Sequence, residues 1–160
     1  MDRTKAVFGL LGWVLLTFTV GMVGTRATVA AIPGWYGHLH HPALSPPSWI
    51  FGPVWTVLYL TMAVAVWLVW LQEGDSRSGR SAASAYMGQL ALNGLWPVVF
   101  FGGQSLGGGL AVIGLLWAAI ILTLVVFWRL RRVAGVLLIP YLAWVTFASV
   151  LNWQLWVLNR

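Results

Sequence analysis

Residues 106–128 read LGGGLAVIGLLWAAIILTLVVFW and contain no charged side chain. A helix needs about 20 mainly apolar residues to cross the hydrocarbon core of a membrane, because each residue advances it by about 1.5 Å. This run is therefore long enough to cross a membrane as a single helix. An uninterrupted apolar run of this length favours a transmembrane helix over a helix inside a soluble protein.

Four further apolar runs of similar length lie around this one, and together they predict an all-α membrane protein with five transmembrane helices. In chain order, the predicted spans are residues 6–32, 50–71, 82–101, 106–128 and 133–158. The links are short except for residues 33–48, which are rich in Pro, His and aromatic residues. Short links place consecutive helices side by side and antiparallel, so we expect one bundle domain over residues 1–160.

The composition also argues for a membrane protein. Hydrophobic residues make up 60% of the 160 residues and charged residues only 8%, whereas soluble domains have roughly 45–50% and about 25%. So few charges cannot cover a soluble surface, which excludes a soluble enzyme and a disordered tail. The net charge of +6 is explained by basic loops at a membrane, and we expect no nucleic-acid partner.

Basic residues are distributed unevenly between the two sides of the predicted bundle. Only Arg26 and Arg160 lie on the side of residues 33–48. Because basic loops stay in the cytoplasm, we expect a bacterial plasma-membrane protein with its N-terminus inside and its C-terminus outside. The basic residues on the N-terminal side are Arg3, Lys5, Arg77, Arg80, Arg129, Arg131 and Arg132.

The predicted spans contain no Asp, Glu or Cys residue. The three acidic residues, Asp2, Glu73 and Asp75, all lie outside them. A proton-coupled pump usually needs an ionisable group within the membrane, so this class is disfavoured. The chain also has no Cys, and without carboxylate pairs or thiols we predict no firm catalytic residue.

Three predicted helices carry aromatic and amide side chains at helical spacing. If these faces converge, they form an aromatic cavity with a few hydrogen-bond donors, as small-molecule sites have. Alternatively, the amides link helices and the aromatic rings fill the bundle. We favour linking for Gln89, and both interpretations stay open for Asn93 with Trp55 and Trp144. The three stripes are Trp55, Tyr59, Met62 and Val66; Gln89, Asn93, Trp96 and Phe100; and Tyr141, Trp144, Ala148 and Leu151 with Asn152.

The long link at residues 33–48 is predicted to cover one end of this cavity. Its three histidines, His38, His40 and His41, have no acidic or Cys ligand nearby in the sequence, so we predict no metal site. Consecutive prolines cannot continue a helix and stiffen the chain before the second span. An aromatic, rigid loop suits a lid, and the residues expected to form it are Trp35, Tyr36, Pro46, Pro47 and Trp49.

Small residues form a separate strip on the third predicted helix. Ser84, Gly88 and Ala91 lie off the stripe that contains Asn93 and Trp96. Strips of small residues allow helices to approach closely within a membrane. We therefore expect a homodimer whose interface includes these three residues.

Several sequence blocks occur in an order that is similar to one known family. They are GMVGTR at 21–26, WY at 35–36 followed by Pro42 and PPSW at 46–49, FGPVWTVLY at 51–59, YMGQLALNGLWPVVFFG at 86–102, and PYLAW at 140–144 with Leu151-Asn152. The block at 86–102 is the most specific. On these blocks, which cover nearly the whole chain, the sequence resembles the TspO/MBR family of translocator and tryptophan-rich sensory proteins.

The resemblance implies a dimeric five-helix receptor or transporter with a ligand cavity near residues 33–48. Its implied ligands are porphyrins such as protoporphyrin IX, haem-type tetrapyrroles, sterols and drug-like molecules, with membrane lipid around it and no required cofactor. The implied ligand-binding residues are Phe51, Gly52, Val54, Trp55, Asn93, Trp96, Ala111, Leu115, Trp144, Ala148 and Leu151, and the stripes add Tyr59 and Phe100.

These points lead to a tetrapyrrole-binding membrane protein that acts as a stress-linked sensor, regulator or carrier. Indole faces stack on flat apolar rings, and a few donors can meet the porphyrin carboxylates. Three alternatives stay open: light-dependent porphyrin degradation using Trp55 and Trp144, transport of a sterol or lipid-type ligand, and a scaffold that modulates partners.

The chain departs from the family pattern at four positions. Leu44 stands where family members often carry Trp in the first loop, and Gly108 stands where animal members carry Trp early in the fourth helix. Both changes are expected to widen the cavity or weaken its aromatic stacking. Trp153 and Val157 interrupt the sterol motif known from animal members, so we expect no specific sterol role.

Overall fold

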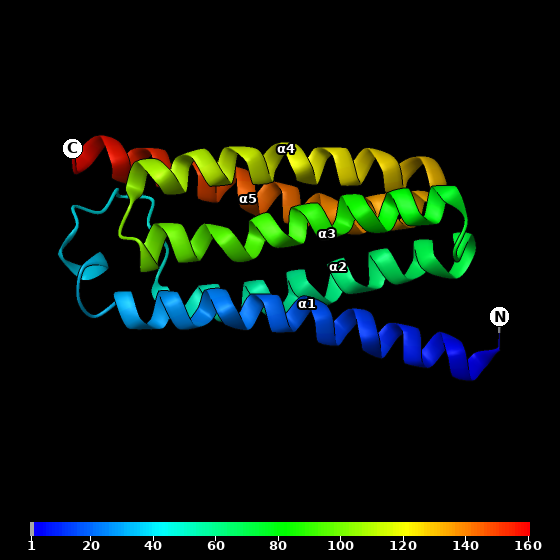
Figure 1. The fold of residues 1–160 in the computed structure, drawn as a ribbon. Helices are drawn as coiled ribbons and strands as arrows, with labels where there is room; N and C mark the ends of the chain where they lie inside the picture. The colour runs from blue at the N-terminus through cyan, green and yellow to red at the C-terminus, as the bar shows by residue number, and fades with distance from the viewer. Residues whose placement is uncertain (1) are drawn as a thin grey trace.

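The computed structural model describes residues 2–160, which form an elongated bundle of five long helices (Figure 1). The long helices are α1 (Arg3–Ala31), α2 (Phe51–Glu73), α3 (Arg77–Pro97), α4 (Leu106–Leu130) and α5 (Arg132–Leu158). Three short helical segments accompany them: η1 (Tyr36–His38), η2 (Ser48–Ile50) and the π-helical η3 (Val98–Gly102). The two termini lie at opposite ends of the bundle (Figure 1).

The predicted all-α class is confirmed, and each predicted span corresponds to one long helix. The largest difference is at the third span, which was expected at 82–101. The helix α3 already begins at Arg77 because the Ser76 hydroxyl accepts a hydrogen bond from the Gly79 backbone N–H at 3.0 Å. It ends as an α-helix at Pro97 and continues as η3. The prediction of a single domain covers residues 1–160. Of these, residue 1 lies outside the described residues.

Four of the five long helices are long and apolar enough to cross a membrane. These are α1, α2 with its preceding η2 turn, α4 and α5. The exception is α3, whose sequence carries two arginines and several hydroxyl and amide side chains. It nevertheless runs alongside the other helices over a comparable length (Figure 1). Hydropathy therefore supports four spans, and the fifth stays a prediction.

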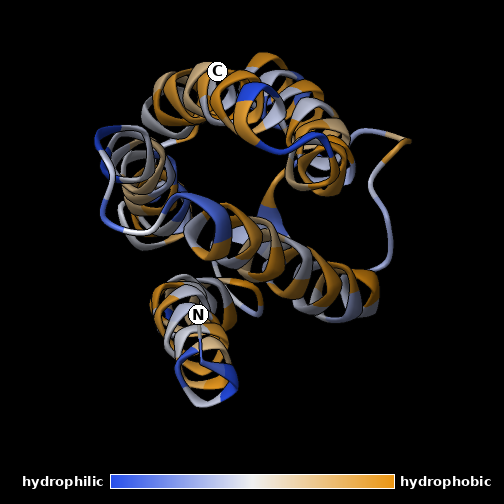
Figure 2. Ribbon diagram, turned by 90° about the vertical axis from the view of Figure 1, so that its right-hand side faces the viewer, coloured by the Kyte–Doolittle hydropathy of each residue, from blue (hydrophilic) through white to orange (hydrophobic). Residues whose placement is uncertain are grey.

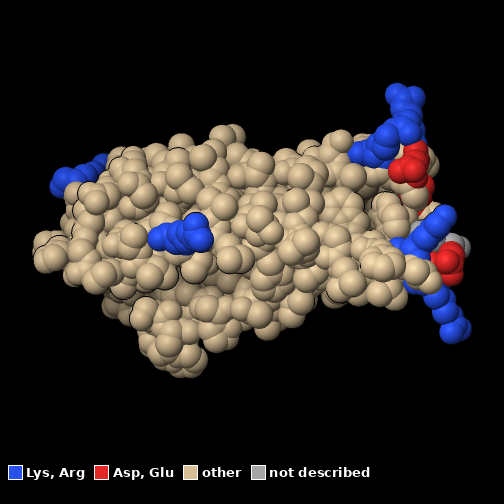
Figure 3. All heavy atoms as spheres, turned by 60° about the horizontal axis from the view of Figure 1, so that its bottom comes forward, with Lys and Arg blue, Asp and Glu red and all other residues tan. Residues whose placement is uncertain are grey.

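The outer surface of the bundle is apolar along its length. Figure 3 shows acidic and basic side chains gathered mainly at one end, beside a long flank that carries almost no charge. Figure 2 shows α1 at one edge of the bundle. Large apolar side chains such as Phe8 and Leu15 on this helix are 68% and 70% exposed. An apolar surface of this extent is suited to contact with lipid tails rather than water.

Glycines determine how closely α1 approaches the other helices. A Cβ atom at Gly21 would lie 2.3 Å from the Tyr59 ring, and one at Gly24 would lie 2.5 Å from the Pro97 ring. Neither position has room for a larger side chain. The two glycines therefore set the contact of α1 with α2 and α3, and they fix the position of Tyr59 beside the buried core.

Candidate ligand-binding site

A chain of hydrogen bonds links three helices in the interior. The Tyr59 hydroxyl on α2 donates to Asn93 Oδ1 on α3 at 3.0 Å, and Asn93 Nδ2 donates to the Tyr141 hydroxyl on α5 at 2.8 Å. The Tyr141 hydroxyl in turn donates to Gln89 Oε1 at 2.9 Å. Gln89, Asn93 and Tyr141 are all buried. For Asn93, as for Gln89, this arrangement favours the helix-linking interpretation.

Two buried donors in this interior have no hydrogen-bond partner among residues 2–160. They are Gln89 Nε2 on α3 and the indole Nε1 of Trp144 on α5. A buried polar group without a partner costs about 1–3 kcal/mol. Both groups are therefore available to an acceptor on a ligand, without first breaking a bond within the protein.

Aromatic rings from α2 and α5 pack together beside the polar chain. Phe51 meets Trp144 edge to face at 5.9 Å between ring centroids. Trp55 lies 5.3 Å from Tyr59 and 6.3 Å from Tyr141. These are two sets of ring contacts, and they are neighbours because Phe51 and Trp55 lie one turn apart on α2, as Tyr141 and Trp144 do on α5. We call the two sets together the α2–α5 aromatic cluster. Four of its members were predicted to bind ligand: Phe51, Trp55, Tyr59 and Trp144.

A second aromatic group lies where residues 33–48 meet the bundle. Trp96 stacks on Phe100 at 5.1 Å, and Trp35 contacts Phe100 edge to face at 5.8 Å. Tyr36 lies 5.3 Å from Phe101, and burial raises the pKa of its hydroxyl. Trp35 and Tyr36 thus cover the rings presented by η3, in the position expected of a lid.

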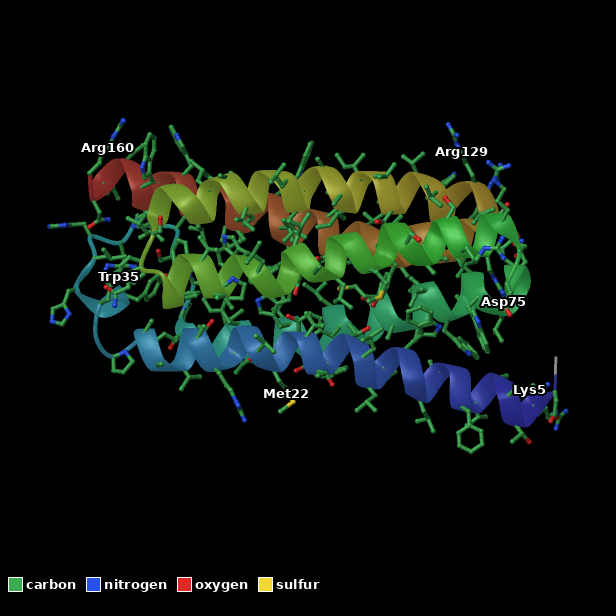
Figure 4. All side chains as sticks on the ribbon, viewed as in Figure 1. Lys5, Met22, Trp35, Asp75, Arg129 and Arg160 are labelled. Carbon is green, nitrogen blue, oxygen red and sulfur yellow. The ribbon has the colours of Figure 1, made fainter. Side chains whose placement is uncertain are left out.

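The remaining part of the long link behaves differently from the prediction. Trp49 is 72% exposed, and Pro46 and Pro47 are half-buried and exposed, respectively. Figure 4 places Trp35 at the same end of the bundle as Arg160. The ring contacts with η3 therefore come from Trp35 and Tyr36 in the first half of the link, whereas Trp49 remains exposed.

Two of the three histidine side chains of the link are held by neighbouring backbone. His38 Nδ1 donates to the Gly34 carbonyl at 2.6 Å, and His41 Nε2 donates to the Tyr36 carbonyl at 3.0 Å. Within residues 2–160, no group of three or more His, Cys, Asp or Glu side chains is placed to hold a metal ion.

Asn159 ties the link to the end of α5, although no sequence pattern indicates this role. Its Oδ1 accepts from the His40 backbone N–H at 2.8 Å, and its Nδ2 donates to the His40 carbonyl at 3.0 Å. The partners are 119 residues apart in the chain. No local sequence pattern predicts a contact at that separation, so these two hydrogen bonds can be identified only from the folded structure.

Other predicted site residues are divided between the inner and outer faces of their helices. Leu151 is buried and Ala148 half-buried on α5, and Val54 is half-buried on α2. Ala111 and Leu115 lie on the exposed outer face of α4, and Gly52 is also exposed. The structure therefore does not bring Ala111 and Leu115 together with the aromatic cluster.

Two hollows of the described structure lie away from the predicted ligand-binding residues. One, of about 190 Å³, lies between Pro42 and the last turns of α5. The other, of about 320 Å³, lies at the opposite end between α3 and α4. In the interior, the rings expected to line a cavity pack against one another instead. A bulky ligand there must displace some of these rings.

Comparison with known proteins places this arrangement in context. A sequence model of the TspO/MBR family matches residues 13–157. The chain is 36% identical to "Tryptophan-rich protein TspO" of Archaeoglobus fulgidus, over 96% of this chain and 98% of that protein. It is 37% identical to "Tryptophan-rich sensory protein" of Cereibacter sphaeroides, over 93% and 94%. It is also 36% identical to "Translocator protein" of Homo sapiens, over 91% and 87%.

Proposed function

Since this chain belongs to the TspO/MBR family and is an integral membrane protein, we propose that it binds a tetrapyrrole and acts as a sensor, regulator or carrier. The observation that carries the proposal is the α2–α5 aromatic cluster, with the unpartnered indole N–H of Trp144 inside it. The sensory and translocator names of its relatives support the same role.

The chemistry of a porphyrin matches this cluster. A porphyrin is a flat, apolar and polarizable ring that carries two carboxylates. Indole and phenyl faces stack on such rings, while a buried N–H that lacks a partner gains a hydrogen bond when an acceptor arrives. Trp55 and Trp144 supply the faces, and Trp144 Nε1 supplies the donor.

Asn93 has a different part in this proposal from the one that the family resemblance implies. Its carbonyl oxygen and one N–H are already used by Tyr59 and Tyr141. A ligand that took these bonds would have to separate α2 from α5. Asn93 therefore holds the helices that present the aromatic rings, and the ligand lies against the rings themselves.

Entry of the ligand is proposed at the end covered by Trp35 and Tyr36. These residues rest on Phe100 and Phe101 through ring contacts alone, while the backbone of the link is held by Asn159. In a bacterial plasma membrane with the N-terminus inside, this end faces outward. The protein is proposed to work as a homodimer through the exposed strip of Ser84, Gly88 and Ala91.

A ligand panel tests the proposed function. Purified protein in detergent is titrated with protoporphyrin IX, a haem-type tetrapyrrole and a sterol, and quenching of its tryptophan fluorescence is followed. We expect saturable binding of the tetrapyrroles and weaker or no binding of the sterol. Sterol binding without tetrapyrrole binding would contradict the proposal and favour transport of a lipid-type ligand.

The same samples separate binding from photochemistry. They are illuminated, and porphyrin absorbance is compared with that of free porphyrin under the same light. Equal bleaching supports a binding protein, whereas faster bleaching with protein would favour the degradation alternative that uses Trp55 and Trp144.

A further inference from the structure

The hollow between α3 and α4 combines basic, hydroxyl and apolar side chains. It lies at the end of the bundle opposite Trp35, where α3 begins and α4 ends (Figure 1). Its volume is about 320 Å³, and it is lined by Arg77, Ser78, Ser81, Val126, Arg129 and Leu130. Residues from two antiparallel helices therefore face one another across a groove that is open to the outside.

The two arginines of this groove are free to bind an anion. Nearby Arg80 and Arg131 already donate to backbone carbonyl oxygens. The guanidinium groups of Arg77 and Arg129, by contrast, have no hydrogen-bond partner among residues 2–160. Because an arginine offers several N–H donors in a planar fork, a pair of them suits a phosphate group.

Acidic residues at this end do not cancel the positive charge. The Glu73 carboxylate accepts from Gln72 Nε2 at 3.2 Å and from the Ser76 hydroxyl at 3.4 Å. Asp75 is the other acidic residue of this turn, and Figure 4 places it at the same end as Arg129. Against these two acids stand five arginines on α3, α4, α5 and the link between α4 and α5: Arg77, Arg80, Arg129, Arg131 and Arg132.

We propose that this groove binds the headgroup of an anionic phospholipid. Its phosphate lies between Arg77 and Arg129, and the hydroxyls of Ser78 and Ser81 donate to it. The choice of a lipid over a soluble anion rests on the apolar part of the groove. Val126 and Leu130 are four residues apart on one face of α4, so they continue the groove from the charged end toward the apolar flank.

The position of the groove along the bundle is consistent with a lipid headgroup as its occupant. Charged side chains gather at this end of the bundle, and the uncharged flank begins beside them (Figure 3). That boundary corresponds to the headgroup region of a membrane. Basic residues at such a boundary are attracted to anionic lipids, and this attraction falls off within a Debye length of the surface.

Native mass spectrometry of the purified protein tests the proposal. Phosphatidylglycerol and phosphatidylcholine with identical acyl chains are added separately, and the bound fraction of each is measured. We compare wild type with the double variant Arg77→Gln/Arg129→Gln, with Arg77→Lys/Arg129→Lys, and with Arg132→Gln as the matched control. Arg132 is exposed at the same end but does not line the groove.

The expected result is a preference of wild type for phosphatidylglycerol. This preference falls roughly thirty-fold in the glutamine double variant, since two basic contacts are lost, and it stays partly in the lysine variant. Binding of phosphatidylcholine and the thermal melting of the protein stay unchanged. An equal loss in Arg132→Gln would overturn the proposal, because charge in general and not the groove would then attract the lipid.

A soluble competitor distinguishes a lipid from a free phosphate. Glycerol 3-phosphate presents the same phosphate without acyl chains, so we expect it to leave phosphatidylglycerol bound. Displacement of the lipid at equal concentrations would overturn the commitment to a lipid, as would unchanged lipid binding in the glutamine double variant.

Discussion

Asn93 is an amide in an apolar helix, and its sequence position alone leaves two roles open. In the structure, the Asn93 side chain forms hydrogen bonds with both Tyr59 and Tyr141. The spacing of Gln89 and Asn93 predicted that both face inward, and both are buried. Which atoms they meet depends on the rotation of α2 and α5, which no pattern within α3 encodes.

Replacing Asn93 by Leu should lower thermal stability with or without ligand. Hydrogen bonds between membrane helices contribute about 0.6 kcal/mol each on average, so losing two costs roughly 1 kcal/mol. Tyr141→Phe is the matched control, because it removes bonds of the same chain and leaves the ring in place. Melting curves of both variants are recorded by circular dichroism. Normal melting combined with lost porphyrin affinity would make Asn93 a ligand donor instead.

Glycine offers a second test at the scale of one residue. Gly21→Ala places a methyl group against the Tyr59 ring, and overpacking of this kind typically costs about 1–3 kcal/mol. Gly12→Ala is the control on the same helix, since among the described residues no atom outside the adjoining helix backbone lies within 4 Å of its added Cβ. Chemical unfolding in detergent should show destabilisation by Gly21→Ala only. Equal stability of the two variants would contradict the close approach of α1 to Tyr59.

The structure at the end of α3 can be predicted only in part from the sequence of this helix. Pro97 lacks a backbone N–H, so a change in the helix near this position is foreseeable. The π-helical turn from Val98 to Gly102 is not, because it depends on packing rather than on a local signal. That turn aims Phe100 and Phe101 at Trp35 and Tyr36, and so builds the contact between lid and bundle.

The link of residues 33–48 should loosen when Asn159 is changed. Asn159→Ala removes both hydrogen bonds to the His40 backbone. We therefore expect faster hydrogen–deuterium exchange across residues 36–42, with the long helices unaffected except for the last turn of α5, where the Leu155 carbonyl also loses its bond from Asn159 Nδ2. Trp49→Ala is the control, because Trp49 is exposed at the far end of the link. Unchanged exchange in Asn159→Ala would show that the aromatic contacts alone hold the lid.

At the scale of the whole molecule, apolar runs predicted five long helices and their order. The helix boundaries were harder to predict, because capping residues such as Ser76 extend a helix beyond its apolar part. Which side chains pack together was predicted best where a stripe repeats over several turns, as for Trp55 and Trp144 in the α2–α5 aromatic cluster. Ala111 and Leu115 are exposed and lie apart from that cluster, because the inner face of α4 depends on how this helix packs against α3 and α5.

Assembly of two chains should depend on the exposed strip of α3. Ser84, Gly88 and Ala91 are all exposed, and among residues 2–160 no atom outside the adjoining helix backbone lies within 4 Å of a Cβ added at Gly88. Gly88→Leu should therefore leave the single chain folded but block close approach of a second one. Crosslinking in bilayers should show less dimer, while Gly114→Leu on α4, which is also open, should not. An undiminished dimer would place the interface on another face.

The central claim is that Trp144 and its neighbours form the tetrapyrrole site, and one titration tests it most directly. Protoporphyrin IX is titrated into wild type, Trp144→Phe, Trp144→Ala and Trp153→Ala, whose indole is 52% exposed and outside the cluster. Loss of a stacked ring costs about 0.5–1.5 kcal/mol of binding free energy, which raises the dissociation constant several-fold. We predict this loss in Trp144→Ala, a smaller one in Trp144→Phe, and none in Trp153→Ala. Equal affinity of all four proteins would contradict the account.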